Sequence, residues 1–173
     1  MTEHDELTTR LAALEERVAQ LEQPATTKVD PGRFWALTGL RERLADSDGQ
    51  VLFTGATNLP TGEYYEWQQG AHTDQLLDAD WTELATPFAA LGHPVRMMLL
   101  QHILRGTRTV GELQELAGLG TTGQLYHHLK QLVAAGWLHA AGRGHYSVPG
   151  ARVVPLLVVL SAVAPPSTKD NRG

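Results

Sequence analysis

The stretch TVGELQELAGLGTTGQLYHHLKQLVAAGWLHAAGRGHYSV, residues 109–148, decides the fold. Thr109 followed three residues later by Glu112 is a capping box, the pattern with which a helix begins, and Gly118 is placed to end that helix. A tight turn containing glycine then leads into a second, longer helix, which Gly136 ends. The stretch therefore predicts two consecutive helices joined by a short turn.

Helices and strands on either side of this pair complete a larger pattern. Asp80 is a suitable N-cap for a helix that reaches residue 91, and Pro94 occupies the first turn of the next helix, where its missing N–H is not needed. After the pair, residues 137–141 and 145–148 have the pattern of two short strands around a glycine-rich turn. This order is typical of a winged helix-turn-helix. We therefore predict a mostly α fold with small β-hairpins.

Five short motifs occur in this part of the chain: LGHPVR at 91–96, TVGEL at 109–113, LYHHLKQL at 125–132, AGWL at 135–138 and GRGHYSV at 142–148. With these motifs, residues 90–148 resemble the ArsR-like winged helix-turn-helix transcriptional regulators. The resemblance implies a homodimer that binds a two-fold-related DNA operator, usually as a repressor released by a signal. Two features depart from the family. The entry to the second helix, residues 118–124, is one residue longer than the entry that is usual in the family. The cysteine motif of the family's metal-sensing branch is absent.

The second helix of the pair is predicted to have a buried and an exposed face. Leu125, Leu129 and Leu132 recur at the spacing of one helical stripe and should be buried. The opposite face suits a DNA major groove, because glutamine reads adenine, lysine pairs with phosphate or guanine, and small residues permit close approach. An ordinary solvated helix surface is the alternative. The exposed face consists of Gly123, His127, Lys130 and Ala134, with Gln124, Tyr126 and Gln131 at its edges. His128 lies at the flank, where we expect a satisfied histidine and not a base contact.

Further candidate DNA contacts lie at the helix starts and in the second hairpin. Threonine hydroxyls at helix N-termini can hold phosphates, or can serve only as N-caps. An arginine between two glycines at a hairpin tip suits a phosphate or the minor groove, or else is a solvated turn residue. The predicted DNA-binding residues are Thr109, Thr121, Thr122, Gln124, Tyr126, His127, Lys130, Arg143 and His145.

The charges of the chain are segregated. The 173 residues have a formal net charge of −5, yet residues 93–152 contain six Lys or Arg against two Glu, a net charge of +4. The remainder carries eight basic and seventeen acidic residues, a net charge of −9. A basic segment within an acidic protein is expected of a nucleic-acid-binding module, although such clustering also arises by chance.

The N-terminus has the pattern of a coiled coil. Five apolar residues alternate at spacings of four and three, and the flanking positions are charged. Two heptads are too short to be stable alone, so this helix should pair with its twin in a second subunit. The alternative is an amphipathic helix packed on its own domain. The predicted dimerisation residues are Leu7, Leu11, Leu14, Val18 and Leu21.

These patterns divide the chain into four segments. The aromatic strand from Tyr64 to Trp67 should pack on the preceding helix, with a ligand platform as the alternative. Residues 153–164 should form a closing helix at the subunit interface, although valine-rich runs also favour strands. The predicted segments are a coiled-coil dimerisation helix at 1–24, a middle segment at 25–79, the winged helix-turn-helix domain at 80–164 and a disordered tail at 165–173. The middle segment consists of a linker, a helix over 34–44 and a hairpin with strands 50–56 and 63–68.

The composition excludes several classes of protein. The chain has no cysteine, which rules out a disulfide scaffold, a zinc–thiolate site and a thiol nucleophile. The N-terminus is polar and acidic, unlike a secretory signal, and the longest apolar run, residues 153–164, is too short to span a membrane. No common catalytic motif is present, and the adjacent His127 and His128 point about 100° apart on a helix, so they cannot share a metal ion. We expect no enzyme, cofactor, metal or membrane partner, and a cytoplasmic, nucleoid-associated protein.

The resulting hypothesis is a sequence-specific DNA-binding transcriptional regulator. It should act as a homodimer on an inverted-repeat operator in double-stranded DNA, as a repressor. Two alternatives stay open. One is a winged-helix module that contacts another protein, and the other is a ligand-responsive sensor whose small-molecule effector lies near the middle hairpin.

Overall fold

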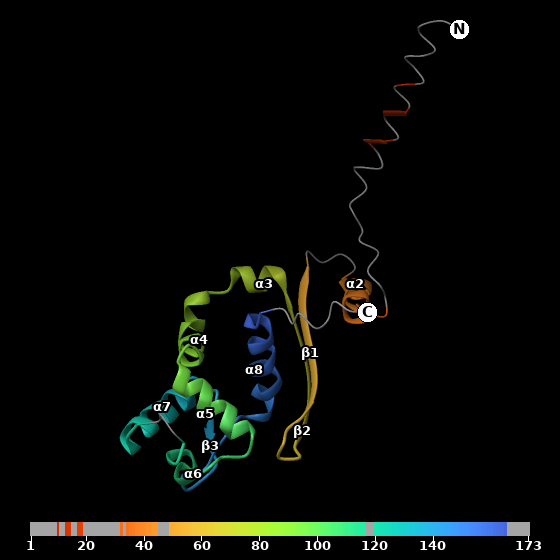
Figure 1. The fold of residues 1–173 in the computed structure, drawn as a ribbon. Coiled ribbons are helices and arrows are strands. Elements are labelled where there is room, and N and C mark those ends of the chain that lie inside the picture. Colours follow the sequence, from red (N-terminus) through yellow and green to blue (C-terminus); the bar gives the residue numbers. More distant parts are fainter. Residues whose placement is uncertain are drawn as a thin grey trace, which may run out of the picture. The chain divides into compact units, whose positions relative to one another are not determined.

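The chain divides into two compact units, Met1–Asp46 (unit 1) and Ser47–Gly173 (unit 2). In unit 1 the structure confirms the helix predicted over residues 34–44, as α2 (Trp35–Leu44). The computed structural model in Figure 1 describes residues 10, 13–14, 17–18, 32, 34–44, 49–116 and 120–165.

The predicted coiled-coil segment is only partly within the described residues. Leu14 and Val18 lie in helical backbone, and their side chains are exposed. Leu7, Leu11 and Leu21 lie outside the described part of the chain. Pairing of this segment with a second subunit therefore stays a prediction.

Unit 2 begins with a long antiparallel hairpin, β1 (Gln50–Asn58) and β2 (Tyr64–His72). The strands pair in continuous register from Gln50–His72 at the open end to Asn58–Tyr64 at the tip. Both strands run past their predicted ends at residues 56 and 68, because the ladder continues through residues of low intrinsic strand propensity once the partner strand is in place. Gly62 in the turn has a φ of 85°, which glycine adopts without strain.

The hairpin packs against the C-terminal helix α8 (Gly150–Val163), and Figure 1 shows the two lying side by side. The contact requires a glycine at residue 55, because a Cβ there would lie 2.6 Å from Cγ1 of Val154. A Cβ at Gly150 would lie 3.2 Å from the Tyr65 ring. Within unit 2 the aromatic strand therefore packs against α8, which begins 78 residues after the end of β2. Its packing on the preceding helix of unit 1 stays a prediction.

Four helical segments connect the hairpin to the predicted helix pair. Asp80 caps the second of them as expected, since its carboxylate accepts the N–H of Thr82 at 2.8 Å. The single helix predicted to end at residue 91 is instead a 3₁₀ turn followed by a short α-helix. The first of the four was not predicted, because six residues are too few to show a helical period. The segments are α3 (Thr73–Asp78), η1 (Trp81–Leu84), α4 (Ala85–Leu91) and α5 (Pro94–Leu104).

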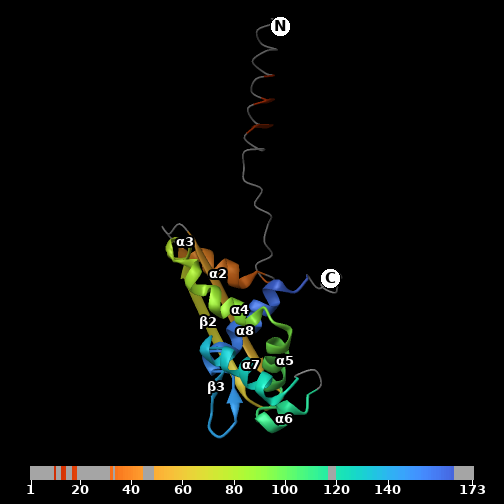
Figure 2. The same ribbon diagram turned by 90° about the vertical axis from the view of Figure 1, so that its left-hand side faces the viewer.

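The rest of unit 2 has the order of elements of a winged helix-turn-helix, which confirms the predicted fold class. Thr109 and Glu112 form the predicted capping box, and Gly136 ends the second helix of the pair with a φ of 72°. The two wing strands are shorter than predicted. The elements are α6 (Val110–Gln114), α7 (Thr122–Ala134), β3 (His139–Ala140), β4 (Tyr146–Ser147) and then α8. Figures 1 and 2 show α6, α7 and the wing together at the end of unit 2 opposite α3.

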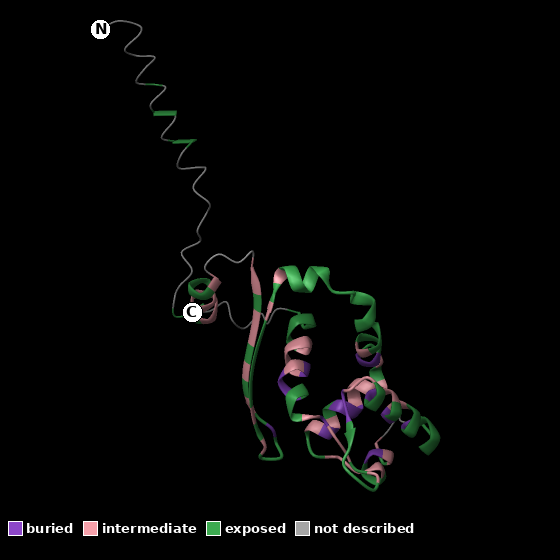
Figure 3. Ribbon diagram, turned by 180° about the vertical axis from the view of Figure 1, so that it is seen from behind, coloured by how far each residue is buried: buried purple, intermediate pink, exposed green. Residues whose placement is uncertain are grey.

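The core of unit 2 lies between α5, α7 and α8, on the inner sides of the helices (Figure 3). Leu99 on α5, Leu129 on α7 and Leu156 on α8 are buried in this core. Residues 153–163 are helical as predicted, and three of them are buried within the subunit, whereas residues 166–173 of the predicted tail lie outside the described residues. Within the described residues, no helix is long and apolar enough to cross a membrane.

Candidate nucleic-acid interface

The orientation of α7 is fixed by its buried stripe and by its cap. Leu125, Leu129 and Leu132 are fully buried, as their spacing predicted. At the start of the helix the Thr121 hydroxyl accepts the backbone N–H of Gln124 at 3.3 Å, and the Gln124 side chain accepts the N–H of Thr121 at 2.8 Å. This reciprocal pair satisfies two backbone donors that a helix N-terminus otherwise leaves free.

The face of α7 opposite the stripe is open to solvent. Lys130 has no ion-pair or side-chain hydrogen-bond partner among the described residues, so its charge is available to a ligand. Every residue predicted for the centre of this face is exposed, and so are two of its three edge residues. The exposed residues are Gly123, Gln124, Tyr126, His127, Lys130 and Ala134.

The third edge residue, Gln131, anchors α7 to the preceding helices. Its amide N–H donates to Nε2 of His127 at 3.0 Å, and its amide oxygen accepts a hydrogen bond from Nη1 of Arg96. Arg96 also donates to the backbone carbonyls of Ala89 at 2.7 Å and Ala90 at 2.6 Å, at the C-terminal end of α4. A guanidinium at this end also complements the helix dipole. The sequence analysis did not predict the hydrogen bonds of Arg96, because its partners lie up to 35 residues away in the sequence.

His128 is half-buried at the flank of α7, as predicted, but it is not satisfied. Its ring lies beside that of His93, with centroids 4.7 Å apart and the ring planes tilted by 43°, and its Nδ1 atom is buried with no hydrogen-bond partner among the described residues. Burial lowers the pKa of the His128 imidazole, and the adjacent charges of His93, Arg96 and His127 lower it further. A lowered pKa favours the neutral ring at pH 7, so this half-buried side chain adds little charge beside the open face of α7.

The wing presents one arginine on a tight turn. Gly142 and Gly144 have φ values of 99° and 73°, which explains why glycines flank Arg143. Backbone hydrogen bonds close the turn, from the N–H of His145 to Gly142 O at 2.7 Å and from Ala141 to His145 O at 2.8 Å. The side chains of Arg143 and His145 are exposed, and the Arg143 guanidinium has no partner among the described residues.

The predicted threonines differ in what their hydroxyls do. Thr109 is half-buried, and its hydroxyl donates to the Glu112 carboxylate at 2.7 Å, so this residue acts as a cap. Its backbone also pairs with His145, which ties the start of α6 to the wing. The Thr121 hydroxyl serves in the cap of α7, whereas Thr122 is exposed with no side-chain hydrogen bond among the described residues.

A set of exposed apolar side chains outside this interface was missed by the sequence analysis. Trp81 and Phe88 are 63% and 61% exposed, on η1 and α4. Leu77 and Leu84, in the same stretch of the sequence, are also exposed. Large apolar side chains that stay exposed and form a contiguous patch mark an interaction surface. Among the described residues, no group of three or more His, Asp or Glu is placed to hold a metal ion.

Comparisons with known proteins agree with this geometry. Residues 91–138 match the family model of a helix-turn-helix domain. A probable mercury resistance operon repressor of Streptomyces lividans is 40% identical over 80 residues, which cover 44% of this chain and 63% of that relative. The chain thus spans less than two thirds of the relative's length. No solved structure matches the chain significantly. The predicted resemblance to helix-turn-helix regulators is confirmed at the level of the domain: residues 91–138, from the end of α4 to the start of the wing, are a helix-turn-helix domain.

Proposed function

We propose that the protein is a sequence-specific DNA-binding transcriptional regulator that works in the cytoplasm, on the nucleoid. The observation that carries the proposal is the division of α7 into a fully buried leucine stripe and an open face with a free cation. A helix held in this way at the end of a helix-turn-helix can enter the major groove without rearranging the core.

The residues of the interface divide into two roles. Gln124, Tyr126 and His127 at the open face of α7 read base edges, and Lys130 pairs with a phosphate or guanine. Arg143 and His145 on the wing, together with Thr122 at the start of α7, contact the sugar–phosphate backbone. Thr109 and Thr121 contribute mainly by capping their helices, which positions the other residues.

The active form in this proposal is a homodimer on an inverted repeat. Two features support it: the coiled-coil pattern of the N-terminus, and the exposed apolar set that includes Trp81 and Phe88. A two-fold dimer presents two copies of α7 to successive major grooves on one side of the duplex, about 10–10.5 bp apart. A 5 bp insertion between half-sites should therefore abolish tight binding.

We further propose that the regulator is a repressor, by analogy with the operon repressor of Streptomyces lividans. Its signal differs from a soft metal ion bound by thiolates, because these 173 residues contain no cysteine.

The proposal is tested by selecting bound sequences from random DNA and measuring affinity for the selected operator against salt. Three of the six basic residues of the segment 93–152 are engaged within the subunit, Arg96 and Arg108 in polar contacts and Arg152 on the ring of Trp137. Arg105 is unpaired among the described residues, but it lies at a cavity whose lining there includes none of the proposed DNA contacts. Lys130 and Arg143 remain, which gives four cations per dimer and a slope of log K against log salt of about −4. A winged helix that contacts another protein would select no sequence and show no such slope.

A further inference from the structure

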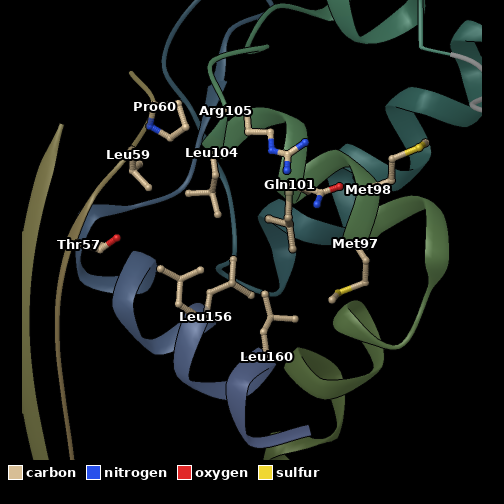
Figure 4. Close-up of a pocket in the computed structure, with 12 residues that line it drawn as sticks. Thr57, Leu59, Pro60, Met97, Met98, Gln101, Leu104, Arg105, Leu156 and Leu160 are labelled. Carbon is tan, nitrogen blue, oxygen red and sulfur yellow. The ribbon is translucent and has the colours of Figure 1, made fainter. Parts of the chain in front are cut away.

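A cavity of about 550 Å³ lies between the tip of the first hairpin, α5 and α8 (Figure 4). Leu59 and Pro60 close it from the hairpin, Met97 and Leu104 from α5, and Leu156 and Leu160 from α8. Pockets that bind small molecules have volumes of about 300–1,000 Å³ and mainly apolar walls. The cavity therefore has the size and the lining of a small-molecule site.

The polar groups of the cavity are few, and two of the three come from one helix end. Gln101 and Arg105 are four residues apart at the end of α5, so their side chains leave the helix on the same side, at the rim shown in Figure 4. Thr57 contributes a hydroxyl from β1. Among the described residues, none of these three side chains has a hydrogen-bond or ion-pair partner. They are therefore free to bind a ligand.

The charge of the rim selects the kind of ligand. Arg105 is the only basic residue among the described lining residues, and none of them is acidic. The two arginines nearest to it in sequence are both engaged: Arg96 holds Gln131 and the end of α4, and Arg108 pairs with Glu63. An unpaired guanidinium beside an apolar cavity favours one anionic group attached to an apolar body.

We propose that this cavity binds an amphipathic organic anion, a molecule with a carboxylate head and a short aliphatic or aromatic body. The carboxylate pairs with the Arg105 guanidinium and accepts a hydrogen bond from the Gln101 amide. The body packs between Leu104, Leu156 and Leu160, with the flexible Met97 side chain adapting to its shape. The site goes beyond the proposed function, because binding here requires no DNA.

The test is isothermal titration calorimetry on the full chain without DNA, with octanoate as the probe and octylammonium as its cationic counterpart of equal length. Octanoate should bind at one site per chain, and octylammonium at least about tenfold more weakly, because a charge-assisted hydrogen bond is replaced by repulsion. If octanoate shows no saturable binding at about millimolar concentration, or if both probes bind equally, the proposal is overturned.

Two substitutions locate the site. Arg105→Gln removes the charge from an exposed side chain and should weaken octanoate about tenfold while leaving octylammonium unchanged or slightly stronger. Arg143→Gln removes the same charge at the wing and should leave octanoate binding unchanged. Leu160→Trp fills the cavity and should abolish binding of both probes, with the fold checked by circular dichroism. Equal octanoate affinity in Arg105→Gln and the unmodified protein contradicts the assignment, whether or not the protein binds DNA.

Discussion

Glu63 at the tip of the first hairpin and Arg108 in the loop between α5 and α6 form an ion pair through both carboxylate oxygens. Nη1 of Arg108 lies 3.1 Å from Oε1 of Glu63, and Nη2 donates to Oε2. The Thr61 hydroxyl donates to the same carboxylate at 2.6 Å. The two partners are 45 positions apart in the sequence, so this ion pair connects the hairpin tip to the loop between α5 and α6, inside the helix-turn-helix domain.

The pair predicts a pH-dependent effect of Glu63→Gln on stability. The hydrogen bonds from Arg108 and Thr61 lower the pKa of Glu63, so the stabilisation is present above the unfolded pKa and is lost as the pH falls through the lowered pKa. Both side chains are partly exposed, which limits the loss at pH 7 to about 0.5–1 kcal/mol. Urea unfolding of both proteins at pH 7 and at pH 3 measures the difference, which should be smaller at the lower pH. Glu83→Gln, with no side-chain partner among the described residues, is the control, and a difference as large at pH 3 as at pH 7 would contradict the assignment.

Gly55→Ala should destabilise unit 2 by about 1–3 kcal/mol, because the new methyl group would overlap Val154 on α8. Thermal or urea unfolding measures the loss. Gly111→Ala is the matched control, since a Cβ there meets nothing within 4 Å and alanine favours the helix by up to about 1 kcal/mol. The double variant Gly55→Ala/Val154→Ala should be less unstable than the sum of the two single variants. Strict additivity would show that the two residues do not meet.

Gln124 has two roles that substitution can separate. Gln124→Glu keeps the capping box and should leave stability unchanged, but it places a negative charge at the DNA and should weaken all operators. Gln124→Ala should change the ranking of operators by about 1–3 kcal/mol at the base that it contacts. Fluorescence anisotropy with a set of singly substituted operators measures both effects. A uniform loss for the alanine variant would mean that Gln124 reads no base.

Arg143→Ala should weaken binding to all DNA sequences alike. The wing cation contacts phosphate in our proposal, so its removal lowers the slope of log K against log salt by about one unit for each lost contact. His127→Ala, on the base-reading face, should instead alter sequence preference with the salt slope unchanged. Affinities at several salt concentrations, with the selected operator and with a scrambled duplex, distinguish the two patterns. An exchange of the two patterns would place the wing, and not α7, at the bases.

Deleting residues 1–24 should weaken dimerisation without unfolding unit 2. The five apolar residues of the coiled-coil pattern lie in the deleted segment, whereas the core of unit 2, as far as the structure describes it, consists of residues between 59 and 160. Light scattering measures the oligomeric state, and circular dichroism reports the fold. Leu14→Asp/Val18→Asp should reproduce the effect, and Arg17→Gln at a charged flank should not. If the intact chain is a monomer at about micromolar concentration, the dimer proposal fails.

The parts of this protein that could be predicted from sequence are those whose causes are local. The capping box of Thr109, the first-turn position of Pro94 and the terminating Gly136 each depend on residues within four positions, and all three occur as predicted. The buried leucine stripe of α7 could be predicted in the same way, because a helical period depends only on the spacing of apolar residues.

The features that escaped prediction depend on contacts between distant residues or on short segments. Packing of Gly55 on Val154 joins residues 99 positions apart, and the bond from Arg96 to Gln131 spans 35. In both pairs, no sequence pattern around one residue indicates which residue it contacts. The helix α3 has too few residues to show a period, and the cavity exists only where three elements meet.

α5 forms one wall of the cavity through Met97 and Leu104, while its Leu99 lies in the core with α7 and its Arg96 donates a hydrogen bond to Gln131. In our proposals α5 therefore lies between the ligand cavity and the DNA-contacting helix. A ligand that shifts α5, and α7 with it, would change the free energy of DNA binding, and the operator would then change the affinity for that ligand by the same factor. Titrating ligand with and without operator, and operator with and without ligand, must therefore return one common coupling constant.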